Sequence, residues 1–242
     1  MTQKTVSFRP QPLLNPPGES QQLAVGLRDE ELIRELVREQ RTGQGYNFPH
    51  TLCLAKSLGV VEEVTKQDRG KMTDDLRKKR DVTKESVGTV NRIYYMSVLG
   101  MDATPTDKEL NEVREVLGEW KRIKHYIGFV MLVKHLNQLG HNTEIDEMTA
   151  RELKAYKPRG DGSVIASYYA DLKSIGVEPP MTKSERQQMF QTLNEKRLDA
   201  YEALAKGTAD INYIIMLDNM RTIFPNKEKQ TSHELPPLKK IT

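Results

Sequence analysis

Apolar residues recur at steps of three and four over most of the chain, and this spacing is typical of the buried face of an α-helix. The clearest run follows Thr106 and Glu109, which have the spacing of a capping box, and continues through Leu110, Val113 and Leu117. The same spacing, with flanking capping residues, glycines and prolines, predicts helices over residues 29–37, 52–58, 83–99, 106–123, 126–139, 147–156, 163–175, 182–206 and 210–224.

The pattern predicts an all-α fold with a core of about eight to ten helices. Sustained alternation of apolar and polar residues, the pattern of a half-buried strand, does not occur. Thr182 and Glu185 predict a second capping box. Gly118 and Gly128 predict a break within the long apolar stretch 110–139. A two-lobed core joined by the polar segment 140–162 is an alternative to a single body.

The two ends of the chain lack the helical pattern. Four of the twelve prolines lie between Pro10 and Pro17, and proline fixes φ and removes a hydrogen-bond donor. We therefore expect an extended arm over residues 1–21, a helical core over 22–224 and a second extended arm over 225–242. The apolar residues in these arms are candidate contacts between subunits, and they are Phe8, Leu13, Leu14, Leu235, Leu238 and Ile241. Two disordered tails are the alternative interpretation.

Composition narrows the class of protein. The chain has 242 residues, 37 Lys and Arg against 34 Asp and Glu, and 37% hydrophobic residues. No apolar run reaches the roughly 20 residues of a membrane span, and residues 1–17 lack the apolar stretch of a secretory signal. Cys53 is the single cysteine, which excludes an intrachain disulfide. We expect an intracellular, non-secreted protein without a membrane span.

Motifs for catalysis or cofactor binding are missing from the sequence. Gly43 and Gly45 are not followed by the Gly-Lys-Ser/Thr of a phosphate-binding loop. His135 and His141 are six residues apart, which is not the spacing of a metal pair on one helical face. Cys53 lies on a short apolar segment, where a buried thiol is commoner than a nucleophile. We expect no enzymatic activity, no metal and no cofactor.

Basic residues gather in two segments. Residues 66–84 hold eight bases against four acids and include the quartet 77–80, and a second group surrounds Trp120. Phosphate backbones are bound by several such donors at once, because affinity comes from the release of condensed counterions. The candidate RNA-binding residues are Lys71, Arg77, Lys78, Lys79, Arg80, Lys84, Arg92, Lys121, Arg122 and Lys124. Solvated helix faces without a ligand are the alternative.

The organisation of the chain resembles that of nucleoproteins and coat proteins of helical, filamentous RNA viruses. The features that carry the resemblance are the arm at residues 7–12, the tail at 225–242 and the basic segments between them. Those proteins are largely α-helical, their arms reach adjacent subunits, and a basic groove holds single-stranded RNA. The resemblance implies a capsid protein or nucleoprotein that acts in the virion and the host cytoplasm.

We therefore expect a structural protein that packages single-stranded RNA. It would form a helical or ring-shaped homo-oligomer through its terminal arms and would bind the RNA backbone without sequence preference. The alternative is an α-helical matrix or adaptor scaffold that binds other proteins.

Overall fold

The computed structural model describes residues 27–42, 48–60, 63–82, 86–206 and 210–225. Within these ranges the chain forms ten helices and no strand, so the predicted all-α class is confirmed. The helices are α1 (Leu27–Thr42), α2 (Phe48–Ser57), α3 (Lys66–Val82), α4 (Ser86–Val98), α5 (Asp107–Arg122), α6 (Tyr126–Gln138), α7 (Glu147–Ala155), α8 (Gly162–Ser174), α9 (Lys183–Ala205) and α10 (Asn212–Ile223).

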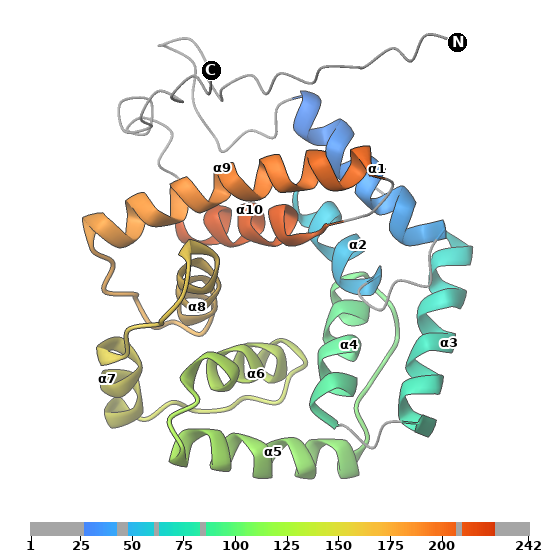
Figure 1. Cartoon of the computed structure of the whole chain (residues 1–242). Helices are drawn as coiled ribbons and strands as arrows, with labels where there is room; N and C mark the ends of the chain where they lie inside the picture. Colours follow the sequence, from blue (N-terminus) through green and yellow to red (C-terminus); the bar gives the residue numbers. More distant parts are fainter. Residues whose placement is uncertain (1–26, 43–47, 61–62, 83–85, 207–209, 226–242) are drawn as a thin grey trace, which may run out of the picture.

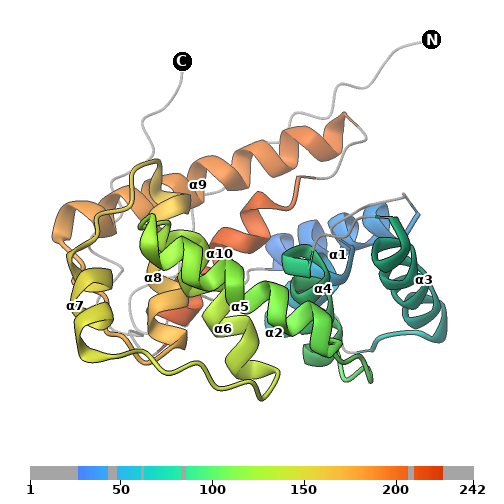
Figure 2. The same ribbon diagram turned by 90° about the horizontal axis from the view of Figure 1, so that it is seen from below.

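The helices pack as a ring of neighbouring pairs rather than as a parallel bundle (Figure 1). Helices α9 and α10 lie together on one side and α5 and α6 on the opposite side, while α8 joins the two sides through its contacts with α6, α9 and α10. Helices α2 and α4 close the ring, and α3 lies outside α4 at the edge of the molecule (Figures 1 and 2).

Buried apolar side chains from all parts of this ring form one cluster that extends from Leu32 in α1 to Ile223 in α10. The segment 140–162, a possible join between two lobes, contains α7. Leu153 of α7 is fully buried in the same cluster. Side chains on both sides of the segment therefore share a core.

The predicted helix starts at Thr106 and Thr182 are confirmed. In each case the threonine hydroxyl accepts a hydrogen bond from the backbone N–H of the glutamate three residues later, and that glutamate accepts one from the threonine N–H. These reciprocal bonds satisfy donors that a helix terminus otherwise leaves open. The signal is local, because both partners lie within four residues of sequence.

The predicted break within residues 110–139 is confirmed, but it does not lie at Gly118 or Gly128, because both glycines lie inside continuous helices, α5 and α6. The chain turns instead between Ile123 and His125, where Lys124 adopts a left-handed conformation with φ of +61°. Gly128 has a packing role: a Cβ at this position would lie 2.7 Å from a ring carbon of Trp120. The glycine lets the indole pack directly on the backbone of α6.

Helix α3 has no counterpart among the predicted helices. Among its described side chains, up to residue 80, the buried apolar ones are Met72 and Leu76, too few to produce a visible periodicity. A local signal for its start exists nevertheless. Thr65 and Asp68 exchange the two hydrogen bonds of a capping box, at 3.1 Å and 3.0 Å.

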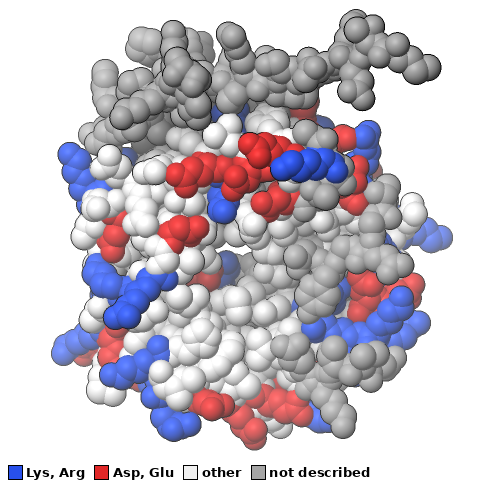
Figure 3. All heavy atoms as spheres, in the orientation of Figure 1, with Lys and Arg blue, Asp and Glu red and all other residues white. Residues whose placement is uncertain are grey.

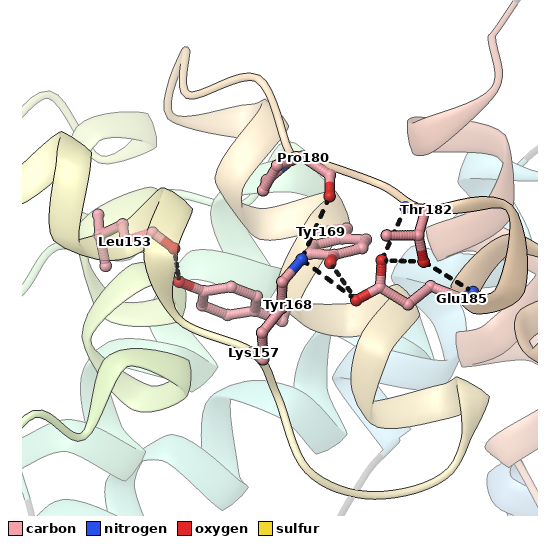
Figure 4. Close-up of polar contacts among 7 residues, drawn as sticks. All are labelled: Leu153, Lys157, Tyr168, Tyr169, Pro180, Thr182 and Glu185. Atoms are coloured by element: carbon pink, nitrogen blue, oxygen red, sulfur yellow. Dashed lines mark hydrogen bonds and ion pairs between the residues drawn. The ribbon is translucent and has the colours of Figure 1, made fainter.

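Two adjacent tyrosines hold helix α8 against its neighbours (Figure 4). Tyr168 and Tyr169 are both fully buried, and buried hydroxyls require hydrogen-bond partners. The Tyr168 hydroxyl donates to the Leu153 carbonyl oxygen at 2.7 Å, and the Tyr169 hydroxyl donates to Glu185 Oε1 at 2.9 Å. One helix is thereby tied to α7 on one side and to α9 on the other.

Substitution of Gly162, at the start of α8, tests how closely α8 packs on α9. A Cβ there would lie 2.6 Å from the Gln188 carbonyl oxygen in α9, so we expect Gly162→Ala to lower the free energy of unfolding by about 2 kcal/mol. Gly118 is the matched control, because it is exposed inside α5 with no atom within 4 Å of such a Cβ. Gly118→Ala should raise the free energy of unfolding by about 0.5–1 kcal/mol. Urea denaturation of both variants measures the difference, and equal effects would contradict the close packing.

Candidate nucleic-acid interface

Helix α3 buries one narrow side and presents the rest of its circumference to solvent. Its buried positions, Asp68, Met72, Leu76 and Lys79, follow one another at steps of three and four. At 3.6 residues per turn, these four positions lie on one side of the helix. The opposite side therefore determines what an external partner meets.

The acidic side chains of α3 lie mostly toward the protein. Asp68 accepts two hydrogen bonds from the guanidinium of Arg41 in α1, at 2.8 Å and 3.1 Å. Asp75 forms an ion pair at 3.2 Å with Arg92 of α4, whose side chain is only 7% exposed. Arginines from the two neighbouring helices thus neutralise these two aspartates.

The basic side chains of α3 lie mostly toward solvent. Lys66, Arg69, Arg77 and Arg80 are exposed, and their spacing places them along one strip of the helix. The ends of this strip are 14 residues apart, which corresponds to about 21 Å along the helix axis. Lys78 is exposed on another side of α3, about 100° around the helix axis from Arg77. Asp74 is the one exposed acid among the α3 side chains described up to residue 80. We call the five exposed bases of this helix, Lys66, Arg69, Arg77, Lys78 and Arg80, the α3 strip.

Arg80 anchors one end of the α3 strip to helix α5. Its guanidinium donates to both carboxylate oxygens of Glu109, at 2.9 Å and 3.0 Å, and to the Thr104 carbonyl oxygen at 2.8 Å. Burial alone would raise the pKa of Glu109, but the hydrogen bonds from Arg80 and from the Thr106 backbone hold it below its usual value. Arg80 is therefore partly engaged within the fold, whereas Lys66 and Lys78 form no ion pair with a described residue.

Three of the predicted RNA-binding residues are buried or bonded within the fold. Lys79 is 6% exposed and Arg92 is 7% exposed, so neither side chain lies on the surface. Lys71 donates to the last carbonyls of α1, at 3.0 Å to Arg41 and 3.2 Å to Gln40, where the helix dipole favours a cation. Lys84 lies outside the described residues.

The second predicted group lies at the far end of α5. Arg122 and Lys124 are exposed, while Lys121 forms an ion pair at 2.9 Å with Asp146, the residue that caps α7. Bonds from the Thr149 backbone and from Lys121 hold the pKa of Asp146 below its usual value. This group is distant from Glu109, where the α3 strip ends, by about 12 residues or 18 Å of helix. The two predicted groups are therefore separate sites rather than one patch.

The RNA-binding residues predicted from the sequence did not include two exposed bases of α3. Lys66 and Arg69 belong to the α3 strip, and the capping box at Thr65 would have placed them on its helix. Figure 3 shows that Lys and Arg also gather at the edge where α7 lies, while the middle of that face is largely uncharged. Part of this charge is paired, because Lys157 contacts the Pro180 carbonyl oxygen and Glu185 (Figure 4).

The predicted intersubunit contacts cannot be placed in the same way. Phe8, Leu13, Leu14, Leu235, Leu238 and Ile241 lie outside the described residues.

Other kinds of chemistry find little support within the described part of the chain. Cys53 is buried, and burial raises the pKa of its thiol to about 12, so the reactive thiolate is not formed at neutral pH. The described residues contain no cluster of three or more side chains suited to a metal ion. None of the described helices is both long and apolar enough to cross a bilayer.

Comparison of the chain with family models, with curated proteins and with solved structures gave no match. Only the chain's own residues therefore bear on its function.

The loss of stability on substitution should differ between a buried and an exposed arginine. Arg92→Gln should lower the free energy of unfolding by about 2–3 kcal/mol, because it leaves Asp75 without its partner in a half-buried position. Arg77→Gln, the same substitution at a side chain that is 72% exposed, should change it by less than about 0.5 kcal/mol. Thermal or urea unfolding of the two variants compares them directly. A surface-like effect at Arg92 would show that its burial contributes nothing to the fold.

Proposed function

We propose that this protein packages nucleic acid, binding the backbone of single-stranded RNA along the α3 strip and assembling into a homo-oligomer through its terminal arms. The observation that carries the proposal is the outward strip of Lys66, Arg69, Arg77, Lys78 and Arg80 on a helix whose acids are largely neutralised from inside. In this proposal the role is structural and not enzymatic.

The chemistry of the strip favours phosphate as its target. Lys and Arg are donors without acceptor groups, and several in a row displace the condensed counterions of a polyanion. Such contacts position a backbone but do not read bases, so binding would be largely indifferent to sequence. The outer position of α3 at the edge of the ring leaves it within reach of a long strand (Figure 1).

Assembly would increase the weak affinity of a single strip. Arms that hold copies side by side present many strips to one strand, and each further contact is then made at high effective concentration. The second group, Arg122 and Lys124, would provide an additional contact on each copy. A polymer that coats RNA in the virion and in the host cytoplasm is the corresponding biological role.

A scaffold that binds other proteins is the second candidate. It is supported by Ile123 and Met148, large apolar side chains that are 54% and 65% exposed and that flank the Lys121–Asp146 ion pair. Exposed apolar groups beside charges are common where one protein meets another.

The α3 strip should control the salt dependence of RNA binding. Replacing Lys66, Arg69, Arg77 and Lys78 together by Gln should weaken binding at low salt. It should also reduce the slope of log affinity against log salt by up to about 2.8, because each bound phosphate of a single strand contributes about 0.7 to that slope. The control replaces four exposed bases elsewhere, Arg34, Lys154, Lys183 and Lys206, and makes the same change in net charge. Fluorescence anisotropy with a labelled homopolymeric RNA gives affinity and slope for both.

Equal reductions in affinity and slope in both quadruple variants would mean that net charge alone acts. Unchanged affinity and slope in the α3 variant would make α3 a solvated helix face and favour the scaffold.

The arms should be required for assembly but not for folding. Deleting residues 1–21 or 226–242 should reduce the mass of the oligomer in light scattering, while the cooperative thermal transition of the helical core remains. The reason is that the described residues from Leu32 to Ile223 already form one buried cluster. A core that no longer unfolds cooperatively after either deletion would assign that segment to the domain instead.

A further inference from the structure

Four aromatic and imidazole rings from three helices meet in one cluster, in which Tyr94 and His135 are buried and His50 and Tyr95 are half-buried. His50 of α2 stacks on Tyr95 of α4, with ring centres 4.3 Å apart. Tyr94 of α4 stacks on His135 of α6 at 3.9 Å, and the rings of Tyr95 and His135 meet edge-on with centres 5.7 Å apart. We call His50, Tyr94, Tyr95 and His135 the ring cluster. It is the place where α2, α4 and α6 meet through titratable groups.

One hydrogen bond of the cluster sets which nitrogen of neutral His135 carries the proton. Its Nδ1 lies 2.7 Å from Asn91 Oδ1, and because that oxygen can only accept, Nδ1 is the nitrogen that carries the proton. The His135 residue is 2% exposed. A second proton would have to enter at Nε2, in a site without access to solvent.

Charged groups of both signs surround the cluster, and Lys134 is the one that opposes further positive charge on the histidines. Lys134 precedes His135 on α6 and pairs with Asp171 of α8 at 2.8 Å. Although burial alone would lower the pKa of Lys134, Asp171 holds it above its usual value, so the ammonium stays charged. Asp218 of α10 also faces this region, where it accepts a hydrogen bond from Ser57, and Cys53 of α2 is close by as a neutral thiol.

We propose that the ring cluster is an acid-sensitive latch that holds α2 against α4 and α6 at neutral pH and loosens when the surroundings become acidic. Protonation of His50 and His135 would add two positive charges beside the permanent charge of Lys134. The contact between α2 and its neighbours is then destabilised by repulsion and by the burial of unsolvated charge.

The direction of the effect follows from the protonation states. Burial lowers the pKa of His50 to about 4, and burial together with Lys134 lowers that of His135. An exposed histidine titrates near 6.5, so the open state binds more protons and gains population as the pH falls from about 6.5 toward 4. Asp171 acts in the opposite sense, because burial raises its pKa and its protonation favours the closed state.

Loosening of α2 would also loosen helix α3, which carries the α3 strip. The ammonium of Lys71 in α3 lies 4.9 Å above the ring of Phe48, the first residue of α2, and also bonds the last carbonyls of α1. Helix α3 is thus held partly through α2. The latch does not depend on RNA binding, and its test involves no RNA.

Hydrogen exchange on the unmodified full chain tests the latch. After correction for the intrinsic pH dependence of exchange, opening of α2 and of the facing part of α4 should increase between pH 7.0 and 5.5. The expected increase is roughly tenfold for each histidine that gains a proton on opening. Helix α9, which does not contribute to the ring cluster, is the internal reference. Equal increases in α2 and α9, or none in α2, would overturn the proposal.

A matched pair of variants assigns the effect to the cluster. His50→Phe keeps a ring against Tyr95 but cannot take up a proton, so the increase in α2 opening should fall by roughly tenfold. His125→Phe makes the same change at an exposed residue and should leave the increase as it is. An undiminished increase in a folded His50→Phe protein would overturn the role of His50. If that variant does not fold, the exchange measurement on the native chain still decides.

Discussion

The burial of helix α8 constrains the rest of the architecture. A helix that packs against three others has to be apolar on more than one side, and each polar group that it buries must find a hydrogen-bond partner. Tyr168 and Tyr169 meet both requirements, since they are neighbours about 100° apart around α8, both rings are buried, and their hydroxyls bond to Leu153 and Glu185. Gly162 then allows α8 to approach α9 at a distance that no side chain would permit. The positions of α7, α9 and α10 follow from this arrangement.

The sequence predicted those features of the fold that are encoded within one or two turns. The capping boxes at Thr106 and Thr182 and the apolar steps between them need only local partners, so the helices that they start were found. The glycines of the stretch 110–139 did not mark its break, which lies at Lys124, because glycine propensity is a weak signal that packing overrides. Gly128 is required by the indole of Trp120, a contact that appears only once α5 and α6 fold against each other.

The candidate site was less predictable than the fold for the same reason. Charge density identified the segment that forms α3, but it did not separate Arg77, which is exposed, from Lys79 and Arg92, which are buried. That distinction depends on where α3 meets α1 and α4. Two buried apolar residues were too few to reveal the helix. Because the sequence did not show which side of α3 is buried, it could not show that Lys66 and Arg77 lie on the same side.

The value of α3 as a cationic surface depends on ion pairs that face away from it. Had Asp68 and Asp75 faced solvent, they would have neutralised part of the charge of the helix and competed with any anionic partner. Arg41 and Arg92 hold these carboxylates from the inside instead, at 2.8 Å and 3.2 Å. Removing a buried arginine therefore does more than weaken the fold, because an aspartate released from its partner becomes free to pair with the strip. The internal ion pairs and the external charge of α3 are one electrostatic arrangement, in which packing decides the direction that each sign of charge faces.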